Sequence, residues 1–445
     1  MISSFSSSSN EAPQVIPIYQ IGLGLVLVLI GPFLLLRKKT RAGIFEKSGF
    51  VPTEIKTKAD DLAGCIWIHA VSVGEFNAVF PLVKKLKEEL PDTPLAISTT
   101  TATGQSIARD KAKDLATIFY FPFDLPFCFN PWFNALRPSM AVIVETEIWP
   151  GFIQECQKRN IPLVSVNARI SPNSFKWYHR FRFFFGPLLK MFTRVGVQTR
   201  SEFERFVQIG SFQERTEILG NIKLDGLTAM ASADRKELRK KLNIKEDDFV
   251  IVAGSTHEGE ELAMLQVIEA LKTESRTDEN RNKSVRLIIA PRHPERFDRA
   301  ATIISQSGYK LKRFSKDEQF SDEEGEVYIL DALGQLTGFY SLASIAFVGG
   351  TIAPIGGHNV AEPYAYSVPV CCGPNIQKTK DIAYALMETG ALLLANNVEE
   401  LSEKVKEVYL NEDAALEIGE KGSRWLKENQ GAVDRAFQMI ESVAK

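Results

Sequence analysis

Short apolar runs alternate with amphipathic helical patterns along most of the chain, and this alternation constrains the fold more than any other feature. The runs form two series. The first comprises residues 65–71, 95–99, 117–121, 140–144, 163–167 and 194–198, and the second comprises 249–253, 285–290, 327–330, 345–348, 368–372 and 391–394. Such alternation is typical of parallel, doubly wound sheets. The sequence therefore predicts an α/β protein with two Rossmann-like domains, most simply facing each other across a cleft.

Length and composition agree with two domains. A chain of 445 residues is longer than one ordinary domain, and its 44% hydrophobic residues provide enough apolar material for two cores. A lysine- and aspartate-rich helical segment at 224–242 separates the two series, which places the boundary within 221–231. The formal net charge of −2 argues against a nucleic-acid partner, because such proteins usually carry a strong basic excess.

The N-terminus differs from the rest of the chain. Residues 1–15 are rich in serine and are expected to be disordered. Residues 16–36 are almost purely apolar, which is about the length that spans a bilayer, and basic residues follow directly at 37–41. A cleaved signal peptide would instead need a basic region before the apolar core and a small-residue cleavage site after it. The segment 16–41 is therefore predicted to be an uncleaved membrane anchor, with the body of the protein in the cytoplasm.

Motifs that would indicate several other chemistries are absent from the sequence. It has no Walker loop and no complete dinucleotide-binding glycine motif, so neither ATP hydrolysis nor NAD chemistry is indicated. It also lacks an Asp-x-Asp string at a strand end, a His/Cys cluster with metal spacing and a Gly-x-Ser-x-Gly elbow. The five cysteines have no paired spacing, which is typical of reduced thiols. We therefore expect neither a metal nor a cofactor.

Glu75 lies where the first predicted strand gives way to a helix. The strand 65–71 runs through Ser72 and Gly74 into Glu75, and an amphipathic helical pattern begins at once. Open α/β sheets bind ligands beyond the carboxyl ends of their strands. A helix N-terminus favours the ionised carboxylate, which can then act as a base. The alternative is a glutamate that only complements the helix dipole.

A glycine-rich loop marks the second half. Glycine pairs at 349–350 and 356–357 flank a loop that leads into a helix predicted to begin near Asn359. Glycines let the backbone approach a phosphate, and a helix N-terminus supplies free N–H donors. Glu362 is placed to bind ribose hydroxyls, and Arg292 is placed to meet a phosphate. A glycine-rich turn, a capping asparagine and a surface ion pair are the structural alternatives.

Polar strings follow the predicted strands in both halves, and four of the five histidines lie in them. Taken singly, each histidine also fits a core or capping role. In chain order the strings are His-Ala-Val-Ser-Val-Gly-Glu (69–75), the threonine-rich run with Thr103-Gly104, Glu-Thr-Glu-Ile-Trp-Pro (145–150), Asn-Ala-Arg-Ile-Ser (167–171), Gly-Asn-Ile-Lys-Leu-Asp (220–225), Ala-Gly-Ser-Thr-His-Glu-Gly-Glu-Glu (253–261), Pro-Arg-His-Pro-Glu-Arg-Phe (291–297) and Gly-Gly-His-Asn-Val-Ala-Glu-Pro (356–363).

Together and in this order, the strings resemble the 3-deoxy-D-manno-octulosonic acid (Kdo) transferases of lipopolysaccharide assembly, which are inverting glycosyltransferases of the GT-B type. The resemblance implies an acceptor-binding domain at 42–224 and a CMP-sugar-binding domain at 225–445, whose last helix packs back on the first domain. It implies transfer of Kdo from CMP-Kdo to the 6′-hydroxyl of the lipid A precursor lipid IVA. The partners it implies are this donor, this acceptor and lipid of the inner membrane, with the catalytic domains on the cytoplasmic side.

The resemblance also implies roles for single residues. Glu75 matches the general base of the family. The donor-binding positions are Arg292, Leu333, Gly334, Gly357, Asn359 and Glu362, and the residues expected near the acceptor or Kdo are Ser72, Glu147, Arg169 and Lys223. The chain departs from the family at 330–336, where Leu330, Leu333 and Gln335 replace the usual Gly, Met and Glu. A side-chain contact at Gln335 is therefore in question, whereas backbone contacts at Leu333 and Gly334 are still expected.

The stretch 175–185 mixes aromatic and basic residues. It fits either a surface that lies on a bilayer or a helix that buries its aromatic residues in the first core. Two other functions also fit the motifs: a GT-B transferase or epimerase that uses another nucleotide sugar, and a membrane-tethered nucleotide-binding protein without turnover. The number of Kdo residues transferred, the tolerance of acceptor acylation and the oligomeric state are not indicated by the sequence.

Overall fold

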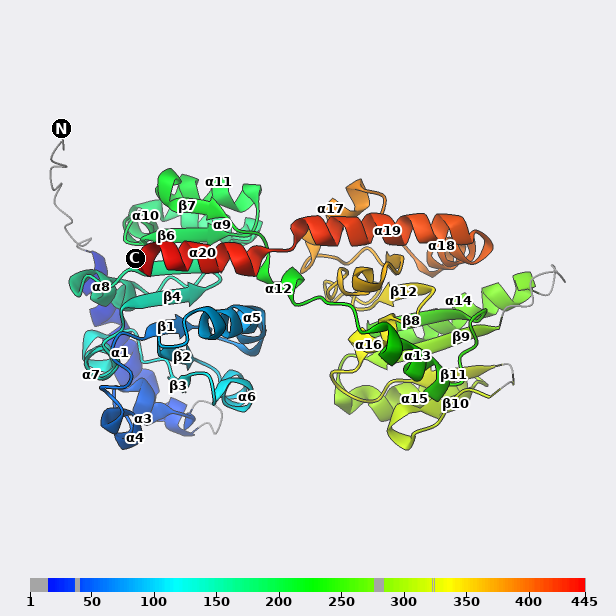
Figure 1. Ribbon diagram of the computed structural model, residues 1–445, viewed down its shortest axis with the longest axis horizontal. Helices are drawn as coiled ribbons and strands as arrows, with labels where there is room; N and C mark the ends of the chain where they lie inside the picture. The colour runs from blue at the N-terminus through cyan, green and yellow to red at the C-terminus, as the bar shows by residue number, and fades with distance from the viewer. Residues whose placement is uncertain (1–14, 37–40, 276–283, 322, 324, 445) are drawn as a thin grey trace. The chain divides into compact units, whose positions relative to one another are not determined.

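The computed structural model describes residues 15–36, 41–275, 284–321, 323 and 325–444. Within these residues the chain forms two compact units (Figure 1). The first unit ends at Gly226 and takes up the chain again from Gln430, and the second spans Leu227–Asn429. Most of the predicted serine-rich tail, at 1–14, and most of the predicted basic flank, at 37–40, lie outside the described residues.

A seven-stranded parallel sheet forms the centre of the first unit, with the order β3-β2-β1-β4-β5-β6-β7. Its strands are β1 (Ile66–His69), β2 (Leu95–Thr99), β3 (Thr117–Tyr120), β4 (Met140–Val144), β5 (Leu163–Ala168), β6 (Arg194–Val197) and β7 (Thr216–Ile218). The strand order reverses at β1, which pairs with both β2 and β4. Such a switch point opens a crevice at the carboxyl ends of the strands, where open α/β sheets bind ligands.

Helices pack on both faces of the first sheet. Trp67 and Ile68, adjacent in β1, belong to separate cores, because successive strand residues point to opposite faces. In one core the rings of Trp67 and Phe152 lie 5.0 Å apart. The helices are α1 (Val15–Leu36), α3 (Ile44–Lys47), α4 (Thr53–Thr57), α5 (Val73–Glu89), α6 (Ala102–Ala112), α7 (Pro126–Leu136), α8 (Pro150–Lys158), α9 (Pro172–Arg180), α10 (Arg182–Leu189), α11 (Arg200–Ile209), the 3₁₀ helix η1 (Gln213–Arg215), α12 (Ile222–Asp225) and α20 (Ala432–Ala444).

The C-terminal helix α20 is part of the first unit, where it packs against α5, α12 and β6 (Figure 1). The Asp225 carboxylate accepts hydrogen bonds from the N–H groups of Gly431, at 2.9 Å, and Val433, at 2.6 Å. Arg435 Nε donates to the Leu219 carbonyl at 2.7 Å. Asp225 thus satisfies N–H groups at the start of α20 that no intrahelical carbonyl can reach.

The second unit contains another seven-stranded parallel sheet, with the order β10-β11-β9-β8-β12-β13-β14. Its strands are β8 (Phe249–Thr256), β9 (Val285–Pro291), β10 (Lys310–Arg313), β11 (Glu326–Ile329), β12 (Ile345–Val348), β13 (Val370–Cys372) and β14 (Leu392–Leu394). The switch point lies at β8, which pairs with β9 and β12. The motifs that follow these three strands therefore meet at one edge of the sheet.

The helices of the second unit also cover both faces of its sheet. In the core beneath α14 and α18, Ile251 of β8 packs with Leu271 and Val405. The helices are α13 (Ser232–Lys241), α14 (Glu260–Ser275), η2 (Pro294–Arg296), α15 (Phe297–Gln306), η3 (Phe314–Lys316), α16 (Leu336–Tyr340), η4 (Glu362–Tyr366), α17 (Lys380–Glu388), α18 (Val398–Leu410) and α19 (Glu412–Asn429).

The predicted doubly wound α/β architecture is confirmed, and each predicted strand coincides with an observed one. Two strands were not predicted, β7 and β10, and both lie at the edge of a sheet. Strand β10 reads Lys-Leu-Lys-Arg, and β7 has only three residues. Short polar edge strands lack the continuous apolar run that marks a central parallel strand.

The predicted transmembrane anchor at 16–36 is not supported. Among the residues that the structure describes, none of the helices combines the length and the apolar character needed to cross a membrane. The start of α1 contacts the first unit instead: Ile16 is fully buried, and the Tyr19 ring lies 6.4 Å from that of Phe184. Gln20 Nε2 donates to Gln154 Oε1 of α8 at 3.1 Å. The first turns of the predicted anchor thus pack against protein.

Candidate active site

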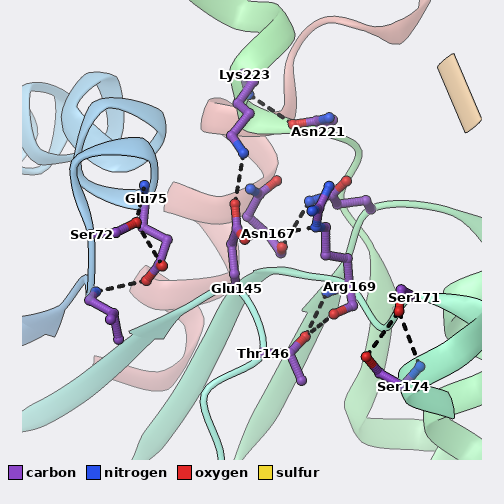
Figure 2. Close-up of polar contacts among 12 residues, drawn as sticks. Ser72, Glu75, Glu145, Thr146, Asn167, Arg169, Ser171, Ser174, Asn221 and Lys223 are labelled. Atoms are coloured by element: carbon purple, nitrogen blue, oxygen red, sulfur yellow. Dashed lines mark hydrogen bonds and ion pairs between the residues drawn. The ribbon is translucent and has the colours of Figure 1, made fainter. Parts of the chain in front are cut away.

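The first strand-to-helix turn of the first unit fixes Glu75. Ser72 caps α5, and its hydroxyl accepts a hydrogen bond from the Glu75 N–H at 3.5 Å. In return, Glu75 Oε2 accepts from the Val71 N–H at 2.7 Å, and Glu75 Oε1 accepts from the Ser72 hydroxyl at 3.0 Å (Figure 2). This reciprocal arrangement resembles a capping box, except that Glu75 accepts from the N–H of Val71 and not from that of the N-cap residue Ser72. Glu75 therefore stabilises the start of the helix, and the same contacts hold its carboxylate at the carboxyl edge of the sheet.

Three carboxylates lie close together at this edge, Glu75 after β1 and Glu145 and Glu147 after β4. Burial raises the pKa of Glu75, and the charge of Glu145 raises it further, whereas its hydrogen bonds and the charge of Lys223 lower it. Burial raises the pKa of Glu147 to about 7, and the charges of Glu75 and Glu145 contribute. A carboxylate whose pKa moves toward neutrality is a better proton acceptor at neutral pH.

Glu145 anchors two cations beside these carboxylates. Lys223 Nζ lies 2.8 Å from Glu145 Oε1, and Arg169 Nε lies 3.8 Å from Glu145 Oε2 (Figure 2). The Glu145 side chain is 17% exposed, against 39% for Lys223 and 50% for Arg169. Both cations retain further N–H donors, so they are able to bind an anionic ligand. Glu145 lies in one of the sequence motifs, but no role was predicted for it. Its position directly after strand β4 could have indicated a place in the site.

An unusual backbone at the ends of β4 and β5 supports this arrangement. Glu145 has φ 60° and Asn167 has φ 58°, in the left-handed region that non-glycine residues rarely adopt. Asn167 Oδ1 accepts from the Ile222 N–H at 3.1 Å, which fixes the start of the helix that carries Lys223. Arg169 N–H donates to Thr146 Oγ1 at 2.9 Å, and that hydroxyl donates to the Arg169 carbonyl. These bonds join the β4 and β5 loops around the cluster.

In the second unit, the glycine-rich loop surrounds an internal carboxylate. The N–H groups of residues 350–353 donate to this carboxylate and are therefore not free for a phosphate. Glu260 is fully buried. Its carboxylate accepts hydrogen bonds, at 2.8–3.1 Å, from the backbone N–H groups of His257, Gly350, Thr351, Ile352 and Ala353. A Cβ at Gly349 would lie 2.8 Å from Glu260 Oε2, so glycine is needed for this close approach.

No helix begins at Asn359, contrary to prediction; the 3₁₀ helix η4 begins at Glu362. Asn359 Oδ1 accepts from the Ala361 N–H at 3.1 Å, so its side chain closes a turn where a helix was expected. Asn359 Nδ2 donates to Glu362 Oε1 at 3.3 Å. Burial raises the pKa of Glu362, whereas the Asn359 bond and the charge of Arg292 lower it. Arg292, Asn359 and Glu362 thus lie close together in the second unit, and their predicted contact with CMP stays a prediction.

The remaining predicted donor residues lie on the same edge of the second sheet. Leu333 and Gly334 follow β11, the neighbour of β9, and the Leu333 side chain is 66% exposed. Gly334 has φ 78°, and a Cβ there would meet open space. Gly357 N–H donates to the Gly350 carbonyl at 2.7 Å, which closes the glycine-rich loop. Among the described residues, no group of three or more His, Cys, Asp or Glu side chains suits a metal ion.

Two parallel α/β units define the class of this protein. A glycosyltransferase from Rickettsia africae has a similar solved structure, with a TM-score of 0.56 and 12% identity, covering 86% of this chain and 99% of that one. A putative UDP-N-acetylglucosamine 2-epimerase from Listeria monocytogenes gives a TM-score of 0.57 at 15% identity, covering 85% and 96%. These similarities concern the fold alone: the two parallel-sheet α/β units resemble those of GT-B glycosyltransferases.

Sequence similarity identifies the family. The family description "3-Deoxy-D-manno-octulosonic-acid transferase (kdotransferase)" matches residues 42–226. A 3-deoxy-D-manno-octulosonic acid transferase from Haemophilus influenzae is 31% identical over 428 residues, which are 94% of this chain and 95% of the relative. The chain belongs to the 3-deoxy-D-manno-octulosonic acid transferase family, and it is a glycosyltransferase.

Proposed function

We propose that the protein transfers Kdo from CMP-Kdo to the 6′-hydroxyl of the lipid A precursor lipid IVA in lipopolysaccharide assembly. The observation that carries the proposal is the state of Glu75: a carboxylate with a raised pKa, fixed by two hydrogen bonds at the carboxyl edge of the sheet, in a chain of this family. The name of the Haemophilus influenzae relative supports the choice of sugar.

Glu75 acts as the general base in this proposal. Its carboxylate takes the proton of the acceptor hydroxyl while the hydroxyl oxygen bonds to the anomeric carbon of Kdo. The bond from that carbon to the phosphate oxygen breaks, and CMP leaves with the electron pair, so the configuration inverts. General base catalysis contributes roughly 10²–10⁴-fold. The remaining acceleration comes from positioning and charge stabilisation.

The charged groups near Glu75 suit the anionic sugar. Kdo carries a carboxylate, and we assign its recognition to Lys223 and Arg169, which Glu145 holds at 2.8 and 3.8 Å. In the second unit, we assign the CMP moiety to Arg292, Asn359 and Glu362, with backbone contacts at 333–334 and 357. Glu147 lines the acceptor side of the first unit in this proposal.

The acceptor is a lipid, and the stretch 175–185 fits contact with a membrane surface. Trp177 and Phe183 are each 65% exposed, whereas Tyr178 and Phe185 pack against the first core. The stretch thus packs some of its aromatic residues against the first core and exposes others. Exposed aromatic residues beside Arg and Lys favour the interface of an anionic bilayer. We propose that the enzyme works at the cytoplasmic face of the inner membrane.

Mass-spectrometric detection of Kdo transfer tests the proposal. The wild-type protein is incubated with CMP-Kdo and lipid IVA in the presence of a chelator, and the product masses count the sugars added. We expect product without added metal. A folded wild-type protein that binds CMP but forms no product would refute the proposed substrates. Transfer from another nucleotide sugar in a donor competition assay would replace the donor.

A further inference from the structure

Three histidines meet at the carboxyl edge of the second sheet, and none of them has a role in the function proposed above. His257 follows β8, His293 follows β9, and His358 follows the glycine-rich loop after β12. The Nε2 atoms of His257 and His358 lie 2.8 Å apart, and the planes of the two rings are within 4° of parallel. The His293 ring lies edge-on to His257, with centroids 5.5 Å apart.

The contact between His257 and His358 requires one shared hydrogen. At 2.8 Å one Nε2 donates and the other accepts, because two lone pairs or two N–H groups would repel at that distance. The separation is also too short for a zinc ion between the rings, because each Zn–N bond needs about 2.0–2.1 Å in tetrahedral geometry. The pair is able to take up one more proton and still share a hydrogen through Nε2.

The packing of the second unit builds this pair and holds it in place. His257 is 8% exposed, and its backbone N–H donates to the carboxylate of the buried Glu260 at 2.8 Å. Gly350 has φ 69°, and a Cβ there would lie 3.0 Å from the His358 ring. The same carboxylate that shapes the glycine-rich loop thus fixes one histidine, and a glycine of that loop makes room for the other.

The surroundings of the pair are mostly cationic. Burial, together with nearby positive charges of which that of Arg292 is the largest, lowers the pKa of His358 to about 4. Burial also lowers the pKa of His257. The charged and titratable groups near the pair are Arg292, His293, Arg296 and Lys378, opposed by Glu261 and by Glu260, whose carboxylate accepts from the backbone N–H of His257. Glu261 is itself paired with Arg296, at 3.1 Å, and therefore offsets little of this positive charge.

We propose that the His257–His358 pair, together with His293 and Arg292, binds the phosphate of the nucleotide and gains one proton when the phosphate binds. This inference rests on the proposed function, because it assumes that a nucleotide occupies the second unit. Without an anion, the surrounding cations keep the pair neutral. A bound phosphate offsets those charges and favours the protonated pair, which in turn adds a charge-assisted hydrogen bond. Nucleotide binding is then coupled to proton uptake.

The coupling has a measurable size. One negative charge about 5 Å from the pair, at an effective dielectric constant of about 20, predicts that binding tightens about tenfold between pH 7 and pH 5. The phosphate of CMP titrates in the same range, with a second pKa near 6. The suitable probe is therefore the methyl phosphodiester of CMP, which carries one constant charge. Cytidine, which has no phosphate, is the matched ligand control.

Calorimetry of the full chain in buffers with different ionisation enthalpies tests the proposal between pH 5 and pH 7. We expect the wild-type protein to take up close to one proton per bound diester at pH 5.5, and to bind cytidine without proton uptake. His358→Gln should bind the diester with little dependence on pH, whereas His179→Gln, in the first unit, should behave like the wild type. Diester binding without proton uptake, or the full pH dependence retained in His358→Gln, would overturn this inference alone.

NMR titration of the wild-type histidines provides a second test that does not depend on a variant folding. We expect the pKa of His257 or His358 to rise when the diester binds, and no such rise with cytidine. Unchanged histidine titrations in the saturated complex would overturn the inference. If neither the diester nor CMP binds the folded wild-type protein, the proposed donor is wrong, and this inference fails with it.

Discussion

Replacing Glu260 by Gln should destabilise the second unit strongly, although the change adds no bulk. Oε1 of Glu260 accepts three backbone hydrogen bonds, from residues 351–353, and Oε2 accepts two, from Gly350 and His257. A glutamine keeps only one acceptor oxygen. If that oxygen replaces Oε1, its NH₂ group faces two N–H donors, so two bonds to a charged acceptor are lost inside the protein.

The magnitude follows from these two bonds. Hydrogen bonds to charged groups contribute about 1.5–3 kcal/mol each, so the loss is about 3–6 kcal/mol. For a unit of 203 residues (227–429), each kcal/mol lowers Tm by about 2–4 °C, which predicts a decrease of at least about 6 °C. The glycine-rich loop also loses its central support, so the affinity for CMP should fall as well.

Differential scanning calorimetry and CMP binding measure both effects. The matched control is Glu258→Gln, two residues away, where the wild-type carboxylate is 65% exposed and pairs with Arg299 on the surface. We expect the control to change Tm by less than about 2 °C, since surface substitutions usually stay within about 0.5 kcal/mol. A Glu260→Gln protein as stable as the control would refute the view that this carboxylate organises the loop.

Two further predictions concern the first unit. The charge of Lys223 lowers the pKa of Glu75, and the charge of Glu145 raises it. Lys223→Met should therefore move the acid limb of the kcat/KM profile to higher pH, and Glu145→Gln should move it to lower pH. Shifts of both variants in the same direction would contradict this electrostatic account. His69 is fully buried, and burial lowers its pKa to about 3, so the folded state excludes a proton that the unfolded chain binds below about pH 6.5. Stability is therefore lost as pH falls through this window, by about 2 kcal/mol between pH 7 and pH 5. His69→Asn should lose about 2 kcal/mol less in urea unfolding over this range, and equal losses would show that His69 does not titrate as described.

The sequence predicted the central strands well because their signal is local. Strands such as β4 and β8 are buried on both faces and read as unbroken apolar runs. The location of the strand-end motifs could then be predicted, since parallel strands place their carboxyl ends on one edge of the sheet. The cap formed by Ser72 and Glu75 is equally local, because the two residues have the three-residue spacing typical of a capping box.

The rest of the site depends on contacts that local pattern does not encode. Glu260 lies 90 residues before Gly350 in the chain, and no sequence pattern near either residue predicts that the loop closes around this carboxylate. The pairing of Lys223 with Glu145 spans 78 residues and needs a left-handed backbone at Glu145. The His257–His358 contact joins residues 101 apart. A long-range partner of this kind decides whether an N–H group is free for a ligand.

The kinetics of Glu75→Gln test the central claim most directly. A glutamine can still accept from the Val71 N–H and donate to the Ser72 hydroxyl, so the cap of α5 and the fold should survive. We predict that kcat for Kdo transfer falls roughly 10²–10⁴-fold, while the affinity for CMP and the Tm stay close to the wild type. Turnover within a few-fold of the wild type would contradict the assignment of Glu75 as the base.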